Sequence, residues 1–205
     1  MSIVTLNDRG VRSVENFGSL NTGSMIFIKK LTASSSSTLS FVNGASDVVL
    51  DSTYKEYVFT FKDIHPSNND IVFQFNMSAD GGSNYNVTKT TSVFRSYHAE
   101  DDSAIALEYR TGEDLAQGTG NQYLCTGQGN GNDESLVGTL RLFNPSSTTF
   151  VKHFIANFNN YHESDIIQNY YIAGYANTTS AVNALQFSFG SGNIDAGDIC
   201  LYGIL

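Results

Sequence analysis

The chain has 205 residues and a formal net charge of −9, with 40% apolar residues, 14 Phe, 11 Tyr and no Trp. This length and aromatic content suffice for one well-buried domain and argue against a disordered chain. The acidic balance argues against nucleic-acid binding by the body of the protein, because phosphate contacts need clustered Lys and Arg.

The first 24 residues differ from the rest in pattern and charge. Their apolar residues follow no clear period, and the stretch ends in a run rich in Gly, Ser and Thr. Residues 1–30 hold four basic and two acidic residues, a net charge of +2, whereas residues 31–205 hold seven basic and eighteen acidic residues, a net charge of −11. We therefore expect an N-terminal arm at 1–24 that docks onto a partner, with a solvated tail as the other interpretation. The expected partner-binding residues of the arm are Arg9, Arg12, Val11, Val14, Phe17 and Leu20.

After the arm, strand-like runs separated by Gly, Asn, Asp and Ser turns continue to the C-terminus. The alternation is clearest at 54–64, where Tyr57, Phe59 and Phe61 share one face, and it recurs at 71–79. A Pro-containing turn between these two runs predicts a hairpin or a corner that crosses between sheets. The expected strands are 25–32, 54–64, 71–79, 87–98, 104–110, 136–144, 149–158, 169–176, 185–190 and 198–205.

Strands at this spacing, without an amphipathic segment of helical length, predict an all-β protein. The expected architecture is a single β-sandwich of jelly-roll or Greek-key type, formed by residues 25–205, with an extended N-terminal arm. The stretch 111–135 is the longest region of low hydrophobicity, so we expect it to form an extended surface loop.

Residues 76–88, NMSADGGSNYNVT, resemble a binding loop at first sight. A phosphate-binding loop would need a helix after the glycines, and a calcium loop would need carboxylates at alternating positions, where only Asp80 is present. Asp favours turns and Gly adopts positive φ at little cost. We interpret this stretch as the tip of a hairpin, with Gly81 and Gly82 at positive φ.

Glycine-rich and histidine-containing strings give weak signals for cofactors or metals. TGQGNGND at 126–133 precedes a strand-like run, whereas a dinucleotide site would need a helix there. The runs YHAEDD (97–102) and YHESD (161–165) would offer metal ligands if their loops met in space, but solvated turns are the commoner role for such runs. Cys125 and Cys200 form no CxxC pair, which excludes a zinc site of that type; free cysteines are expected, and pairing in space stays open. We expect neither a metal nor a cofactor.

Signals for catalysis are also weak. The chain has no G-x-S-x-G elbow, and none of its four His residues has a motif partner. Paired carboxylates for glycoside hydrolysis could come from Glu100, Glu108, Glu113 and Asp114, but no Trp is present to stack on sugar rings. We therefore expect no enzyme.

The remaining signals concern the membrane and the surface. No apolar run approaches the roughly 20 residues that span a bilayer, and no signal peptide is evident, so a soluble product made in the cytosol is expected. Six tyrosines expected to be exposed would suit contacts with glycans or proteins, or would simply lie at the margin of a sheet. They are Tyr85, Tyr97, Tyr161, Tyr170, Tyr171 and Tyr175.

Several strings resemble a family of tailed-phage virion proteins that is common in phages of marine bacteria, including cyanophages. They are STYKEYVFTFKDIHPSNNDIVFQFN, DGGSNYNVTKTTSVFRSYH, LFNPSSTTFVKHFI and GNIDAGDICLYGIL, together with LNDRGVRSVENFGSLNTGS in the arm. The resemblance implies a component of the phage particle and carries over no functional residue.

The resulting hypothesis is a phage virion structural protein on the particle exterior, acting as a capsid decoration or as a tail or fibre-type component. Its expected partners are other virion proteins and further copies of itself, with a trimer as the first expectation. A receptor- or glycan-binding module of a phage tail is the alternative, and a sugar-depolymerising enzyme is a weaker one.

Overall fold

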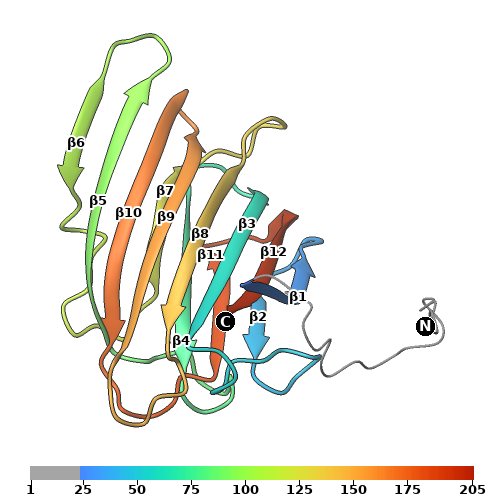
Figure 1. Ribbon diagram of the computed structural model, residues 1–205. Coiled ribbons are helices and arrows are strands. Elements are labelled where there is room, and N and C mark those ends of the chain that lie inside the picture. Colours follow the sequence, from blue (N-terminus) through green and yellow to red (C-terminus); the bar gives the residue numbers. More distant parts are fainter. Residues whose placement is uncertain (1–23) are drawn as a thin grey trace, which may run out of the picture.

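The computed structural model describes residues 24–205, which form twelve β-strands and no helix (Figure 1). The first six strands are β1 (Met25–Thr32), β2 (Leu39–Val42), β3 (Glu56–Pro66), β4 (Ile71–Ser78), β5 (Lys89–Ala99) and β6 (Ile105–Tyr109). The others are β7 (Gln122–Gln128), β8 (Leu136–Phe143), β9 (Lys152–His162), β10 (Ile166–Ala176), β11 (Ala184–Phe189) and β12 (Ile194–Ile204). The expected all-β class is confirmed. No helix long and apolar enough to cross a membrane occurs in the described part of the chain.

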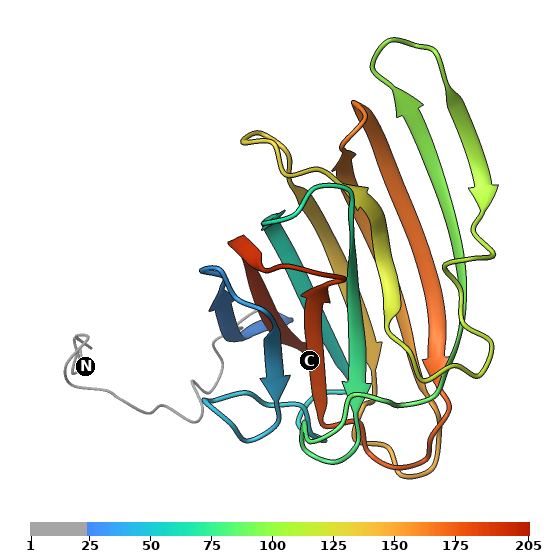
Figure 2. The ribbon, with the colours of Figure 1, turned by 180° about the vertical axis from the view of Figure 1, so that it is seen from behind.

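The strands form two layers of a sandwich. The large sheet has the order β1-β12-β3-β8-β9-β10-β5-β6, and the small sheet has the order β7-β4-β11-β2. All neighbouring strands are antiparallel, and the two sheets are joined at a single residue pair, Gln128 of β7 with His162 of β9. Figure 2, seen from behind, shows the small sheet in front of part of the large one.

Within this sandwich lies a jelly roll. The chain crosses from one sheet to the other as it runs through β1, β2, β3 and β4, and does so again through β7, β8, β11 and β12. This places β1-β12-β3-β8 against β2-β11-β4-β7, which is the eight-stranded arrangement of two Greek keys. The expected jelly-roll sandwich is thus confirmed for the described residues.

Two hairpins enlarge the jelly roll. The hairpin β5–β6 follows β4, and the hairpin β9–β10 follows β8; both add to the same edge of the large sheet. We call these four strands the extension. They stand at the left of Figure 1, where β6 forms the outermost strand. Most of the strands of the extension are eleven residues long, so the large sheet reaches well beyond the small one.

The core between the sheets is aromatic. Phe61 of β3 packs edge-on against Phe73 of β4 with ring centroids 5.9 Å apart, and against Phe187 of β11 at 5.0 Å. These contacts join the two sheets, since β3 belongs to the large sheet and the other two strands to the small one. Edge-to-face aromatic pairs contribute about 0.5–1.5 kcal/mol beyond their area burial.

Three expectations from the sequence are wrong. Two strands were missed: β2, and β7 inside the expected loop 111–135, where Leu124 and Cys125 are fully buried. The turn NMSADGGSNYNVT is not a hairpin tip, because β4 and β5 lie in different sheets and do not pair. It crosses between the sheets, although Gly81 and Gly82 do adopt positive φ, 72° and 83°.

The third wrong expectation is Tyr170, grouped with exposed tyrosines, which is fully buried. The corner at 65–70 is a crossing between sheets, one of the two expected forms, because it joins β3 to β4. Both cysteines are free, with Cys125 buried and Cys200 half-buried. The expected arm, including all six of its partner-binding residues, lies outside the described residues.

Candidate functional site

The outer face of the large sheet, turned away from the small sheet, is the most distinctive surface among residues 24–205. Residues alternate between the core and solvent along each strand, so every second side chain of the extension points outward. An unusual number of these are large, apolar or aromatic, and exposed. They are Phe94, Ile105, Leu107, Tyr109, Ile155, Ile167 and Tyr171, joined by Val137 on β8.

Strand register brings these side chains together. Tyr109 of β6 lies opposite Phe94 of β5, which lies opposite Tyr171 of β10. The rings of Phe94 and Tyr171 stack, with centroids 4.9 Å apart and planes 12° from parallel. One row of the outer face therefore presents three aromatic side chains side by side.

A shallow depression of about 540 Å³ lies next to this row. Its floor includes the small side chains of Ser92 and Ala173, which are cross-strand partners, together with Ile155 on β9. Tyr175 and His153, with ring centroids 5.9 Å apart, line the side away from the stacked pair. The small residues in the middle and the rings of Tyr175 and His153 at one side create a hollow with mainly apolar walls.

The outer face of the extension carries no full charge. The outward residues of β5, β6, β9 and β10 include Ser, Thr, Asn, His, Tyr and aliphatic side chains, but no Asp, Glu, Lys or Arg. Among them, Asn157 donates a hydrogen bond to Asn169 Oδ1 at 3.2 Å. The protein as a whole has a net charge of −9, but a partner that covers this face would not have to bury any charged side chain of the protein.

The other side of the extension holds an ionic cluster. Arg95 donates to Glu108 Oε1 at 2.8 Å, and Arg110 donates to the same oxygen at 2.9 Å. Arg110 also donates to Glu113 Oε1 at 2.7 Å. The hydrogen bond from Arg95 is the main cause that holds the pKa of Glu108 below its ordinary value. Burial raises the pKa of Tyr170, whose hydroxyl lies 3.2 Å from Arg95.

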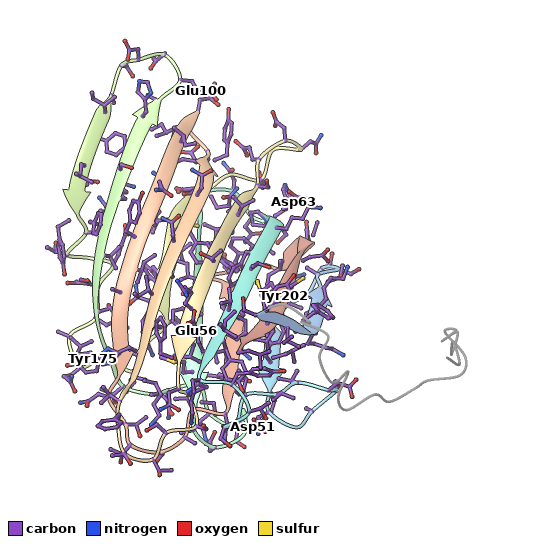
Figure 3. All side chains as sticks on the ribbon, in the orientation of Figure 1. Asp51, Glu56, Asp63, Glu100, Tyr175 and Tyr202 are labelled. Carbon is purple, nitrogen blue, oxygen red and sulfur yellow. The ribbon has the colours of Figure 1, made fainter. Side chains whose placement is uncertain are left out.

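The four carboxylates considered for glycoside hydrolysis are not gathered in one cleft. Glu108 and Glu113 share Arg110, and Asp114 accepts a hydrogen bond from Tyr109 at 2.7 Å. Glu100 follows the C-terminal end of β5. Figure 3 shows it at one end of the extension, with Tyr175 at the opposite end. Arg95 and Arg110 thus form ion pairs with two of these carboxylates, Glu108 and Glu113.

The two histidine-containing runs do meet in space. Glu100 N donates to Asp165 O at 3.0 Å, and His98 lies 3.0 Å from Asp102. Tyr161 donates to Asp165 Oδ1 at 3.1 Å, and its pKa is raised, chiefly by a hydrogen bond with Glu100. The loops that join β5 to β6 and β9 to β10 are therefore tied to each other at one end of the extension.

One group of possible metal ligands combines two residues of the run 161–165 with one residue from another loop. Asp70, His162 and Glu163 place ligand atoms within 4.8 Å of one another. His162 Nδ1 already accepts a hydrogen bond from Ser164 N at 3.1 Å, and Ser164 Oγ donates to Glu163 Oε1. These hydrogen bonds hold residues 162–164 in a tight turn. The string at 126–133 runs from β7 into a turn and then β8, with no helix after the glycines.

Comparisons with family models, with curated proteins and with solved structures find no match for this chain. The candidate site therefore depends on the geometry of the outer face. Sequence reasoning missed this surface, although it had noted Tyr171 and Tyr175. The signal was available in 104–110, where Ile105, Leu107 and Tyr109 alternate with Ala106 and Glu108. Alternation alone does not tell which set faces solvent.

Proposed function

We propose that the chain is a structural protein on the exterior of a phage particle, a capsid decoration or a tail or fibre-type component. The observation that carries the proposal is the outer face of the extension, which is rich in exposed aliphatic and aromatic side chains and free of full charges. Monomeric proteins rarely leave large apolar patches uncovered, and such patches mark interaction sites. The proposal assigns no catalytic step to the chain.

Other features support the same function. The strings that resemble phage virion proteins cover β3, β4 and β12 of the jelly roll and β5 of the extension, so the resemblance includes both parts of the large sheet. The arm, with Arg9 and Arg12, is proposed to anchor the body to neighbouring virion proteins after synthesis in the host cytoplasm. In an assembly, those neighbours would cover the outer face, and each Å² of apolar area buried would contribute about 25 cal/mol to the free energy of association.

Incorporation into particles tests this proposal. Purified particles should contain the chain, as detected by mass spectrometry, and a chain lacking residues 1–20 should fold but fail to incorporate. Ile155→Asp places a charge on the outer face and should reduce incorporation, whereas Phe150→Asp, at an exposed residue outside the extension, should not. Absence of the chain from particles would refute the proposal, and normal incorporation of the shortened chain would refute the anchoring role of the arm.

A glycan-binding module of a phage tail is the second candidate, and the hollow beside Tyr171 favours it. Rings on two sides and neighbouring amides such as Asn157 and Asn169 suit the flat apolar faces and hydroxyls of an uncharged sugar. Binding of the full chain to a glycan array should then fall with Tyr171→Ala and Tyr175→Ala, and stay constant with Phe150→Ala. A chain that binds no glycan would leave the first proposal in place and remove the second.

A further inference from the structure

Three strands in the described part of the chain have only one neighbour: β1, β2 and β6. Free strand edges invite pairing with other chains, and proteins protect them with lysines, bulges or short length. β1 carries Lys29 and Lys30 and a bulge, and β2 has only four residues. β6 is also short, with five residues, but it has no Lys, Pro or bulge, and its residues Ile105, Leu107 and Tyr109 are 72%, 72% and 52% exposed.

The backbone of these same three residues faces the free edge. In an antiparallel ladder, alternate residues bond inward to the neighbouring strand. Ala99 N donates to Ala104 O, and Arg110 N donates to Val93 O, so the even-numbered residues from 104 to 110 bond to β5. The N–H and C=O groups of Ile105, Leu107 and Tyr109 consequently point away from the sheet. Among residues 24–205, Figures 1 and 2 show no other segment beyond this edge.

We propose that β6 pairs with β6 of a second copy of this chain, antiparallel, about a twofold axis at Leu107. In this register Leu107 lies opposite Leu107 of the second copy, and Ile105 lies opposite Tyr109. Every outward N–H and C=O of these three residues then has a hydrogen-bond partner. If one strand were shifted by an odd number of residues, residues whose backbone groups point outward would lie opposite residues whose groups bond to β5. A shift by two residues would leave an end residue of each strand without a partner.

The side chains fit this register on both faces. The outer face places only apolar and aromatic groups opposite one another, and such cross-strand pairs stabilise sheets. On the inner face, Glu108 lies opposite Ala106 of the second copy, so like charges do not meet. The carboxylate of Glu108 is moreover already paired with Arg95 and Arg110. Two acidic copies can therefore approach at this edge.

The pairing also joins the outer faces of two extensions into one surface. The row of Tyr109, Phe94 and Tyr171 would meet Ile105 of the second copy across the axis, followed by His98 and Ile167 of that copy. The dimer does not depend on the proposed role in a particle, because it concerns the edge of β6 and not the partner that covers the face. Separate variants distinguish the two proposals: Leu107→Lys tests the dimer, and Ile155→Asp tests incorporation into particles.

Sedimentation of the full chain over a range of concentrations tests the dimer. We expect a dimer for the wild type, and for Leu107→Lys a dissociation constant raised about tenfold or more, since two charges would meet at the axis. Ile155→Lys is the matched control and should leave the dimer intact. It replaces an exposed aliphatic residue of the same face that lies on β9, away from the β6 edge. Circular dichroism should show the same fold for all three proteins. A monomer, a trimer, or a dimer that Leu107→Lys leaves unchanged would overturn the proposal.

Engineered cysteines test the register. The Cα atoms of the Leu107 pair would lie about 5.5 Å apart, within the range that a disulfide spans. Under mild oxidation Leu107→Cys should give a covalent dimer on a non-reducing gel, whereas Ile105→Cys should not, because its partner is Tyr109. The double variant Ile105→Cys/Tyr109→Cys should again cross-link, and the wild type, with its free Cys200, is the background control. Cross-linking of Ile105→Cys alone would contradict the register.

Discussion

The rings of Phe61 and Phe158 meet across Gly138, with centroids 4.8 Å apart. The three residues occupy one row of the large sheet, since Gly138 pairs with Phe61 on β3 and with Phe158 on β9. The missing side chain of the glycine leaves the space through which the two rings touch. Gly138 thus determines how tightly the middle of the large sheet packs against the small one.

Gly138→Ala should destabilise the protein by about 1–3 kcal/mol, the usual cost of overpacking a core. A Cβ atom at this position would lie 2.4 Å from Phe158 Cδ1 and 2.7 Å from the carbonyl oxygen of Asn157, and the backbone atom cannot move aside cheaply. Urea unfolding measures the change in free energy. Gly120→Ala, where a Cβ meets nothing within 4 Å, is the control and should alter stability little. Equal stability of the two variants would refute this role of Gly138.

The sequence predicted most strands of the fold because alternation marks them locally. Tyr57, Phe59 and Phe61 are buried as their spacing indicates. β7 was missed because neighbours such as Leu124 and Cys125 are both buried, which removes the period-2 pattern, and because Gly127 and the glycines that flank the strand suggest a loop. β2 was missed because four residues, LSFV, are too few to show a pattern.

Tertiary relationships could not be predicted from local pattern. Asp-Gly-Gly at 80–82 correctly indicated a turn with positive φ, but which strands it joins depends on pairing with distant residues. Tyr170 and Tyr171 are adjacent in sequence, yet one is buried and the other exposed, because the phase of β10 is set by its partners β5 and β9. The candidate site lies on the exposed set, so it became visible only with the sheet.

Lys89 should make the stability of the protein depend on pH above neutrality. Its side chain is fully buried, donating hydrogen bonds to Asn76 Oδ1 at 2.5 Å and to Val87 O at 2.8 Å, with no carboxylate partner. Burial lowers its pKa from 10.5 to about 8. Between these values the unfolded chain binds more protons than the folded one, so stability rises with pH in this window.

Comparison with Lys89→Met isolates this effect, because other titrating groups are common to both proteins. From pH 7 to pH 9.5 the free energy of unfolding of the wild type should rise by about 2 kcal/mol relative to the variant. Urea unfolding at both pH values gives the difference. Lys62→Met, which removes an exposed lysine, should show no such trend. A constant difference between wild type and Lys89→Met would show that Lys89 does not titrate in this window.

The carboxylate of Asp80 should stabilise the loop that crosses between β4 and β5, and this stabilisation should be lost at low pH. Its carboxylate accepts hydrogen bonds from Ser78 Oγ at 2.7 Å and from Asn84 N at 2.9 Å, with a further one from the Asn84 amide. These bonds, led by Ser78, lower the pKa of Asp80 from 3.8 to about 2. The stability that they add is present above pH 4 and is lost as the pH falls toward 2.

Asp80→Ala should therefore be less stable than the wild type at pH 7, and the difference should shrink between pH 4 and pH 2. Thermal unfolding at several pH values gives both quantities. Asp133→Ala, at an exposed acidic residue of another loop, serves as the control for the loss of a negative charge. A gap between wild type and Asp80→Ala that stays constant down to pH 2 would assign the effect to the loop conformation and not to the carboxylate.

Arg110 should stabilise the fold by compensating a buried charge. Glu113 is 7% exposed; its Oε1 accepts hydrogen bonds from Arg110, and its Oε2 is buried without a partner. Removing one member of a buried ion pair is costly because the other charge remains. Arg110→Met should cost roughly 2–4 kcal/mol, with the lower end favoured because the side chain of Arg110 is 31% exposed.

Replacing both members should recover much of that loss. In Arg110→Met/Glu113→Leu no carboxylate is left uncompensated at position 113, and Glu108 keeps its hydrogen bond from Arg95 at 2.8 Å. Urea unfolding of the wild type, both single variants and the double variant gives the coupling energy directly. We expect the double variant to be more stable than Arg110→Met. Additive losses would mean that the pair stabilises the extension by packing, with the charge of Glu113 playing little part.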